Sequence, residues 1–175
     1  MKTTTPTAPR IYVACLSSYN AGILHGRWID AAQDADEIQQ EVLAMLDDST
    51  QPGSEEWAIH DFEGFAGLPV EEYSSFEHIA EWADLIAEHG PAYGVYAEAI
   101  GTTYATPEGF EDCYRGAYDS EKDFGEEQSE WEFYELRDTR IWSFFDIDHY
   151  THELFLDGFW SARDVDGQLH VFSDR

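Results

Sequence analysis

The stretch RIYVACLSSYNAGILHGRWIDA, residues 10–31, decides the fold of the N-terminal part of the chain. Residues 10–17 are rich in apolar and β-branched side chains and predict a strand. Residues 20–22, Asn-Ala-Gly, are typical of a turn, and residues 25–29 predict a second strand after it. Alternating apolar and polar side chains over residues 56–62, EWAIHDF, predict a third strand. We therefore expect a three-stranded antiparallel sheet.

An amphipathic helix is predicted between the second and third strands. Asp34 stands at its N-cap position, and the apolar side chains after it recur at helical spacing. These apolar residues are Ile38, Val42, Met45 and Leu46. The other faces of the helix carry acidic side chains. Sheet and helix together predict a small α+β domain over residues 10–64, preceded by a flexible tail at residues 1–9.

The middle of the chain, residues 65–117, predicts a small helical domain. Residues 74–77, Ser-Ser-Phe-Glu, match a capping box, and the helix after it should end at Gly90. The expected buried residues of this helix are Phe76, Ile79, Ala83 and Ile86. Thr106 followed by Pro107 predicts the start of a further helix. That helix should carry Phe110, Tyr114 and Ala117.

The last part of the chain, residues 118–175, predicts another α+β domain. Aromatic residues are spaced through the acidic run at residues 120–135, so we expect this run to be structured. Two strands, residues 159–165 and 168–172, flank Asp166-Gly167, which predicts a two-residue hairpin. The fold class is therefore α+β, with three small domains.

Acidic residues dominate the charge of the chain. There are 37 Asp and Glu against 9 Lys and Arg, for a formal net charge of −28. The sequence is nevertheless 43% apolar and 15% aromatic, which predicts a folded chain despite charge that opposes compaction. No Lys or Arg lies between Arg27 and Arg115, and that stretch contains 21 acidic residues. Repulsion between these like charges favours an elongated shape and lowers stability. A role outside folding must therefore favour the excess of acidic residues.

Motifs for catalysis or cofactor binding are missing from the sequence. It contains no Walker A loop, no G-x-G-x-x-G and no G-x-S-x-G. His149 and His152 lack the i,i+4 spacing of a zinc helix. Residues 146–148 begin like a calcium loop, but its glycine is missing. His60 with Asp61 is better interpreted as a strand edge. We therefore expect no enzyme, no catalytic residues, no metal and no cofactor.

The expected compartment is the cytoplasm. Cys15 and Cys113 form neither a disulfide framework nor a metal spacing, which is typical of a reducing environment. The N-terminal residues resemble no signal peptide, and no apolar run approaches the ~18–20 residues of a membrane span. No membrane partner is expected.

A dense field of carboxylates can imitate the phosphates of duplex DNA. Duplex DNA carries one negative charge per ~1.7 Å of its axis. Acidic residues three or four apart on a helix stand ~5–6 Å from each other, close to the spacing of successive phosphates along a strand. We expect the carboxylates between Asp30 and Asp112 to line one continuous face. The residues predicted to form it are Asp34, Asp36, Glu37, Glu41, Asp47, Asp48, Glu55, Glu71, Glu72, Glu77, Glu81, Asp84, Glu88, Glu98, Glu108, Glu111 and Asp112.

Three other interpretations fit an acidic surface. A halophilic protein would also be acidic and poor in lysine, although that adaptation gives no reason for the aromatic content. An acidic chaperone, or an inhibitor of another basic nucleic-acid-binding protein, fits the charge as well as a DNA mimic does. A solvated acidic face without function is the third alternative.

Three segments together resemble the ArdA family of antirestriction proteins, over about residues 10–172. They are residues 10–31, the segment EEWAIHDFEGF at 55–65, and LFLDGFWSARDVDGQLHVF at 154–172. The most distinctive part is the pattern Tyr-Asn-x-Gly-x-Leu-His-Gly-x-Trp-Ile, which runs from Tyr19 to Ile29.

The resemblance implies an elongated homodimer, with three small domains per subunit, that is similar to bent B-form DNA. Such proteins occupy the DNA-binding groove of type I restriction-modification enzymes, both methyltransferase core and holoenzyme, and protect incoming mobile DNA. They act without catalysis or cofactor and bind no nucleic acid themselves. The implied dimer interface lies toward the C-terminus, although a hairpin core explains the same side chains equally well. Its residues are Leu154, Phe155, Phe159 and Trp160.

Overall fold

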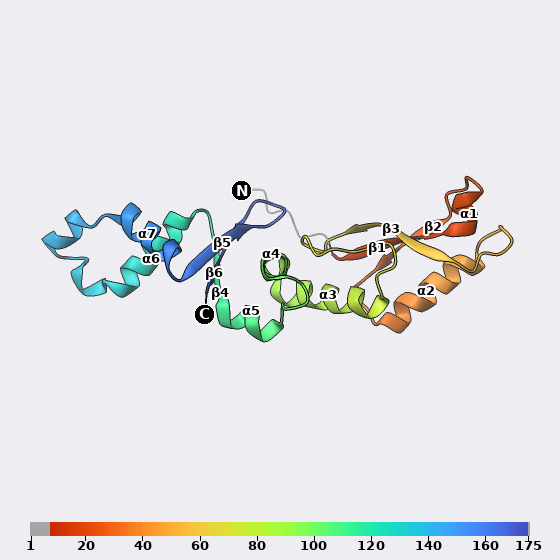
Figure 1. The fold of residues 1–175 in the computed structure, drawn as a ribbon, viewed down its shortest axis with the longest axis horizontal. Coiled ribbons are helices and arrows are strands. Elements are labelled where there is room, and N and C mark those ends of the chain that lie inside the picture. The colour runs from red at the N-terminus through yellow and green to blue at the C-terminus, as the bar shows by residue number, and fades with distance from the viewer. Residues whose placement is uncertain (1–7, 175) are drawn as a thin grey trace. The chain divides into compact units, whose positions relative to one another are not determined.

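The computed structural model describes residues 8–174, and its fold is α+β with two three-stranded antiparallel sheets (Figure 1). This confirms the predicted fold class. Residues 1–7 of the predicted tail lie outside the described residues. Pro9 is buried, and its carbonyl accepts a hydrogen bond from the Ala31 N–H at 2.9 Å. No helix among the described residues has the length and apolar character needed to cross a bilayer.

The first sheet has the strand order β2-β1-β3 and is antiparallel, as predicted. Its strands are β1 (Arg10–Cys15), β2 (Gly26–Asp30) and β3 (Trp57–Glu63). In the central strand, Ile11 pairs with Ile29 of β2 and Val13 pairs with Ile59 of β3. These four side chains are buried. The sheet therefore contributes one apolar face to the core.

The first strand is shorter than predicted, because the ladder ends at Cys15. The chain then turns into a short helix, α1 (Leu16–Asn20). The N–H of Ala21 donates to the carbonyls of Ser17 and Ser18 and closes this turn. The apolar pattern of residues 10–17 therefore extends past Cys15, the last residue of β1 that pairs in the sheet.

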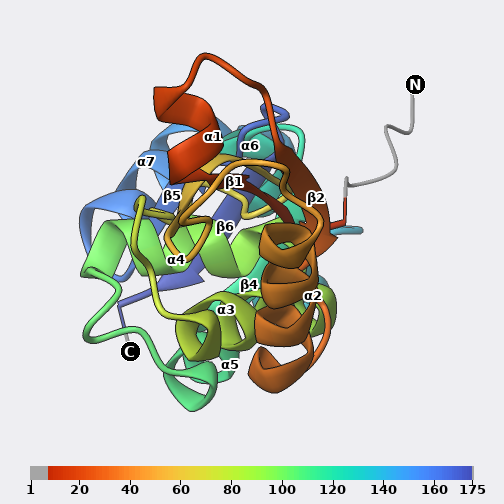
Figure 2. The same cartoon turned by 90° about the vertical axis from the view of Figure 1, so that its right-hand side faces the viewer.

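Helix α2 (Ala35–Asp47) has Asp34 at its N-cap position and buries the four predicted apolar residues. It packs against β1 and β2 and against α3 (Phe76–His89). Figure 2 shows α2 and α3 side by side below the sheet. The apolar faces of both helices and the sheet thus share one core.

Helix α3 buries the predicted residues, but the predicted capping box is wrong. Ser75 is the N-cap, and its hydroxyl accepts the N–H of His78 at 3.3 Å. The neighbouring Ser74 hydroxyl instead accepts the N–H of Glu71. The helix ends at Gly90, whose φ of 69° lies in the left-handed region, and α4 (Pro91–Ile100) begins at the next residue.

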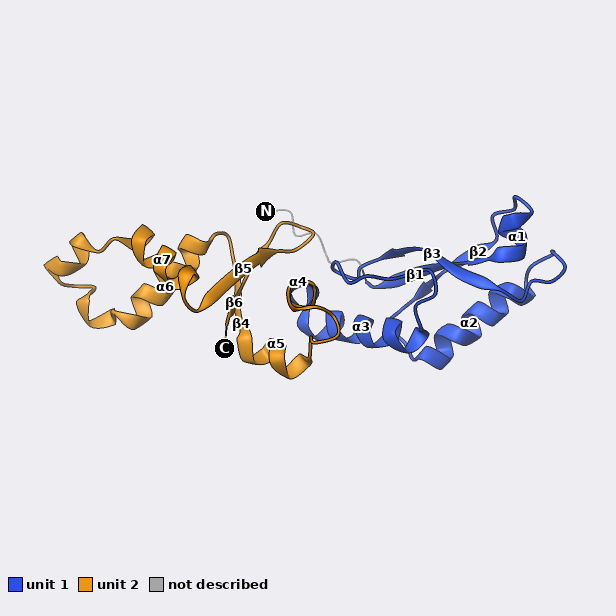
Figure 3. Ribbon diagram, in the orientation of Figure 1, with its two compact units in different colours: residues 1–94 blue, residues 95–175 orange. Residues whose placement is uncertain are grey.

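Two compact units divide the chain, with residues 1–94 in unit 1 and residues 95–175 in unit 2 (Figure 3). The boundary falls within α4. The division into three small domains at residues 10–64, 65–117 and 118–175 stays a prediction, as does the elongated shape.

Unit 2 begins with the end of α4 and with α5 (Pro107–Cys113), where Thr106 caps the helix and Pro107 is its first residue, as predicted. The continuation of this helix to Ala117 is wrong. Tyr114 and Ala117 instead belong to β4 (Tyr114–Tyr118), since Tyr114 pairs with Phe172 in the second sheet. Pairing between strands distant in sequence thus overrides a local pattern that also fits a helix.

The second sheet has the order β4-β6-β5, with β5 (Phe159–Arg163) and β6 (Leu169–Ser173) forming the predicted hairpin. Five residues, 164–168, separate the two strands, rather than the predicted two. The N–H of Asp164 donates to the carbonyl of Gln168, and the Asp164 side chain accepts two further backbone N–H groups. Gly167 follows the turn with a φ of 87°.

Two helices cover this sheet, α6 (Glu121–Glu132) and α7 (Ile147–Leu156). The helical turns η1 (Tyr134–Leu136) and η2 (Arg140–Phe144) connect them. The acidic run at residues 120–135 is therefore structured, as predicted. Phe124 of α6 is fully buried against Leu169 and Val171 of β6.

Replacing Phe124 by Ala should lower the free energy of unfolding by about 3–5 kcal/mol, because it opens a cavity in this core. Trp131→Ala is the matched control, since this aromatic residue of the same helix is 78% exposed and its loss should change stability by less than about 0.5 kcal/mol. Urea denaturation followed by circular dichroism measures both. Equal effects of the two changes would contradict the placement of Phe124.

Candidate functional site

The predicted carboxylate surface is exposed at nearly every position. Only Glu41 is half-buried, and its side chain accepts a hydrogen bond from the amide of Gln33 at 2.8 Å. The members of this set up to Glu88 belong to unit 1, and those from Glu98 onward belong to unit 2. A single continuous face across both units stays a prediction.

Helix α3 arranges its carboxylates in a row. They follow each other at i, i+4, i+7 and i+11, so all stand on one side of the helix, away from its buried side chains. This α3 stripe consists of Glu77, Glu81, Asp84 and Glu88. Neighbouring members are ~5–6 Å apart, and the row extends over roughly 16 Å at 1.5 Å of rise per residue.

Helix α2 repeats this arrangement. Glu37, Glu41 and Asp48 lie at i, i+4 and i+11, and Asp36 and Asp47 stand beside them. The buried side chains of α2 occupy the adjacent part of the helix surface, and Met45 lies one turn from Glu41, which is half-buried. Since α2 and α3 are neighbours, unit 1 carries two acidic helices in one layer. The packing of the two helices in the fold thus fixes the positions of these carboxylates.

Cations compensate almost none of this charge. Within residues 8–174, Arg27 is the only Lys or Arg within 4.0 Å of a carboxylate of the predicted surface, at 3.2 Å from Asp48. Both side chains of that pair are exposed, so it contributes little stability. The charge of Glu72 is the main cause that raises the pKa of the Tyr73 hydroxyl, and Glu56 adds to it. The surface is therefore a strong local source of negative potential.

A comparison with protein families places the chain in a known family. The family model described as Antirestriction protein (ArdA) matches residues 11–164. The chain belongs to the ArdA family. No curated protein matches it. ArdA proteins are inhibitors rather than enzymes, and family membership supports an antirestriction function directed at restriction-modification enzymes.

The pattern from Tyr19 to Ile29, most distinctive in the resemblance to ArdA, has structural roles in this chain. The His25 ring nitrogen Nε2 lies 2.6 Å from the carbonyl of Met45, which ties the loop before β2 to α2. A Cβ on Gly26 would lie 2.6 Å from the carbonyl oxygen of Val13, so only glycine fits there.

The acidic residues at the start of α7 also have structural roles. Asp146 caps this helix by accepting the N–H of His149 at 3.0 Å. Asp148 pairs with Lys122 of α6 at 2.6 Å. His149 and His152 are both exposed. The two contacts account for Asp146 and Asp148.

The predicted dimer interface lies beside the core of unit 2. Leu154, Phe155 and Phe159 are half-buried and pack against the cluster around Phe124. The ring of Trp160 stacks on Phe172, with centroids 4.2 Å apart. Each side chain thus contributes to the hairpin core and still presents part of its surface. Their role in dimerisation stays a prediction.

Sequence reasoning missed a group of exposed apolar side chains at the end of α6 and in the segment that connects it to α7. Their exposed fractions range from 38% to 78%. The group comprises Trp131, Tyr134, Leu136, Ile141 and Phe144. The sequence does contain a signal of their exposure, because these residues show no helical or strand periodicity that would bury them.

Removing charge from the α3 stripe should stabilise the protein. The triple change Glu81→Gln, Asp84→Asn and Glu88→Gln removes like-charge neighbours at i,i+3 and i,i+4, so the free energy of unfolding should rise by about 0.5–1 kcal/mol at low salt. In about 1 M salt the gain should vanish, since the Debye length falls to ~3 Å. Urea denaturation at both salt concentrations measures it. A loss of stability at low salt would show that the stripe supports the fold.

Proposed function

We propose that this ArdA-family chain is a mimic of duplex B-DNA that occupies the DNA-binding groove of type I restriction-modification enzymes. The observation that carries the proposal is the pair of acidic helices α2 and α3, whose carboxylates stand in rows with almost no cationic partners. Rows of fixed negative charge are what a groove built to bind phosphates recognises. The net charge of −28 equals the bare charge of roughly 14 base pairs.

Competition with DNA is the expected mode of inhibition. A groove lined with Lys and Arg attracts the carboxylates as it attracts phosphates, and binding releases counterions. The same groove serves both the methyltransferase core and the holoenzyme, so one surface can act on both. Incoming mobile DNA would then escape cleavage in the cytoplasm. No catalytic step and no cofactor are needed.

A restriction assay with purified type I enzyme tests the proposal. Inhibition should appear near one protein per groove, be relieved by excess unmodified DNA and weaken steeply as salt is raised. A chaperone of basic proteins would not compete selectively with duplex DNA for one enzyme. Inhibition that excess DNA fails to relieve would contradict mimicry.

Neutralising one face should abolish inhibition, whereas single changes should be nearly silent. One exposed carboxylate contributes only a few tenths of a kcal/mol. The six-residue variant carries Gln or Asn at Glu37, Asp47, Glu77, Glu81, Asp84 and Glu88. Its control removes the same charge from exposed sites outside the predicted surface, namely Asp119, Glu135, Asp138, Glu153, Asp157 and Asp174. At equal net charge, the first should lose at least about tenfold in affinity and the second much less.

We also propose that two subunits associate through unit 2, around Leu154, Phe155, Phe159 and Trp160. The half-buried surface of these residues supports this placement. Leu154→Glu should weaken the dimer, measured as molar mass by light scattering over a dilution series. Leu156→Glu is the matched control, because Leu156 lies on the same helix, is 65% exposed and is not in the predicted interface. If both variants dimerise as the wild type does, the interface lies elsewhere.

A further inference from the structure

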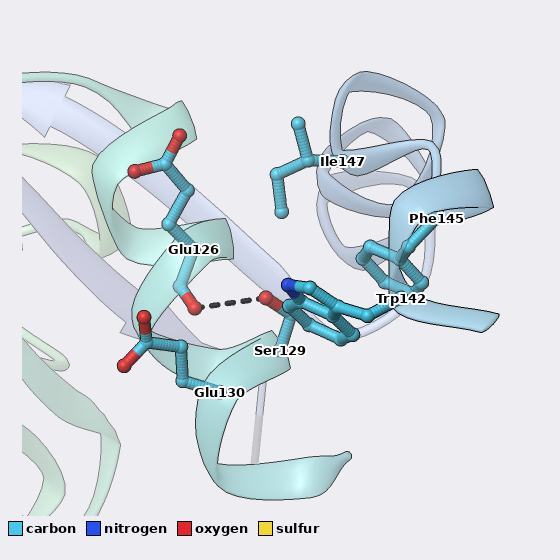
Figure 4. A pocket seen from close by; sticks show the side chains of 6 residues that line it. All are labelled: Glu126, Ser129, Glu130, Trp142, Phe145 and Ile147. Carbon is cyan, nitrogen blue, oxygen red and sulfur yellow. Dashed lines mark hydrogen bonds between the residues drawn. The ribbon is translucent and has the colours of Figure 1, made fainter. Parts of the chain in front are cut away.

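A cavity of about 250 Å³ lies in unit 2, between α6 and the segment that leads into α7 (Figure 4). Six residues line it: Glu126, Ser129, Glu130, Trp142, Phe145 and Ile147. Its volume is below the roughly 300–1,000 Å³ of sites for small molecules and cofactors. The cavity therefore suits a single side chain better than a free ligand.

One wall of the cavity is a flat aromatic surface. The rings of Trp142 and Phe145 stack with centroids 4.8 Å apart and an interplanar angle of 8°. Ile147 extends this apolar wall. The buried Ser129 hydroxyl donates to the Glu126 carbonyl at 2.8 Å, so this polar group already has a partner. The wall thus offers a ring face rather than hydrogen bonds.

The opposite side of the cavity is negatively charged. Glu126 and Glu130 stand at i and i+4 on α6, on one side of the helix. Glu130 lies 3.5 Å from Arg137, a guanidinium of this chain. Among the described residues, no hydrogen-bond donor lies within bonding distance of the Glu126 carboxylate. The pKa of Lys122 is raised mainly by its hydrogen bond to Asp148 and also by the charge of Glu126, but the Lys122 amine bonds to Asp148 at 2.6 Å. The Glu126 carboxylate is therefore available to bond to an external cation.

A ring face beside a carboxylate that accepts no hydrogen bond within the described residues selects for a particular chemistry. Cations are attracted to the faces of aromatic rings, and Trp is the strongest of them. The planar guanidinium can stack on the indole while its N–H groups bond to a carboxylate in a two-pronged geometry, which the compact ammonium of lysine cannot do. An arginine side chain matches both walls.

We infer that this cavity binds an arginine side chain of the partner protein. The inference rests on the proposed function for the source of the arginine, because grooves that bind phosphates are rich in this residue. It adds a discrete contact to a surface whose other charges act collectively. The site lies on α6, outside the carboxylates of α2 and α3.

Titration of the full-length protein with N-acetyl-L-arginine amide tests the inference. The indole N–H signal of Trp142, assigned with a Trp142→Phe variant, is followed by NMR. The arginine probe should cause a saturable shift. The uncharged and nearly isosteric N-acetyl-L-citrulline amide should bind at least about tenfold more weakly, because the charge-assisted bond and the ring contact need the cation.

Glu126→Gln should weaken binding of the arginine probe by about tenfold, since it keeps the shape of the side chain and removes its charge. Glu153→Gln is the matched control. Glu153 is an exposed carboxylate of α7 that does not line the cavity, and its replacement should leave the affinity unchanged. Because both positions are exposed, neither variant should perturb the fold.

Three results would overturn the inference: no saturable shift, equal affinity for both probes, or equal weakening by the two variants. A shift of the Trp142 signal on dilution, with none on adding the probe, would assign the cavity to contact between two copies of the chain. The restriction assay separates the two proposals. Inhibition without binding of the probe would remove only the arginine site, and binding without inhibition would remove only the proposed function.

Discussion

Repulsion between like charges is the constraint on which the rest of unit 1 depends. Among the described residues, its two acidic helices have a single exposed pair with an Arg, Arg27 with Asp48, so burial of their apolar faces must hold them. Full burial of a side chain such as Ile38 or Ile79 contributes about 1.5–3 kcal/mol, while one like-charge pair on a helix costs about 0.2–0.5 kcal/mol. A few buried residues per helix therefore outweigh the row of charges.

Unit 2 uses its acidic side chains differently. Several of them accept hydrogen bonds within the fold, as when Glu132 accepts the Tyr150 hydroxyl at 2.6 Å and Glu121 accepts that of Ser161 at 2.7 Å. On α3 the carboxylates face water, and no Lys or Arg among the described residues lies within 4.0 Å of them. The contrast explains why the candidate surface belongs mainly to unit 1, although acidic residues occur throughout the chain.

Local patterns in the sequence predicted most elements, and the wrong helix assignment at Tyr114 arose where contacts distant in sequence decide. The periodicity from Ile38 to Leu46 was sufficient for α2, since one face alone determines its packing. The spacing of Phe110 and Tyr114 also fits a helix, but pairing with β6 places Tyr114 in a strand. Exposure of the carboxylates followed from their positions on helices. The cavity beside Trp142 could not be predicted from the sequence, because it depends on how η2 packs against α6.

The placement of the α3 stripe on a helix has an entropic consequence. The backbone beneath Glu77, Glu81 and Asp84 is already fixed by the burial of Ile79 and Ala83. Ordering a flexible acidic segment would cost roughly 1–2 kcal/mol per residue of backbone at the moment of binding. In a helix, folding has already ordered the backbone. Binding therefore has to restrict only the rotamers of the side chains. Such preorganisation lets individually weak charges add up to useful affinity.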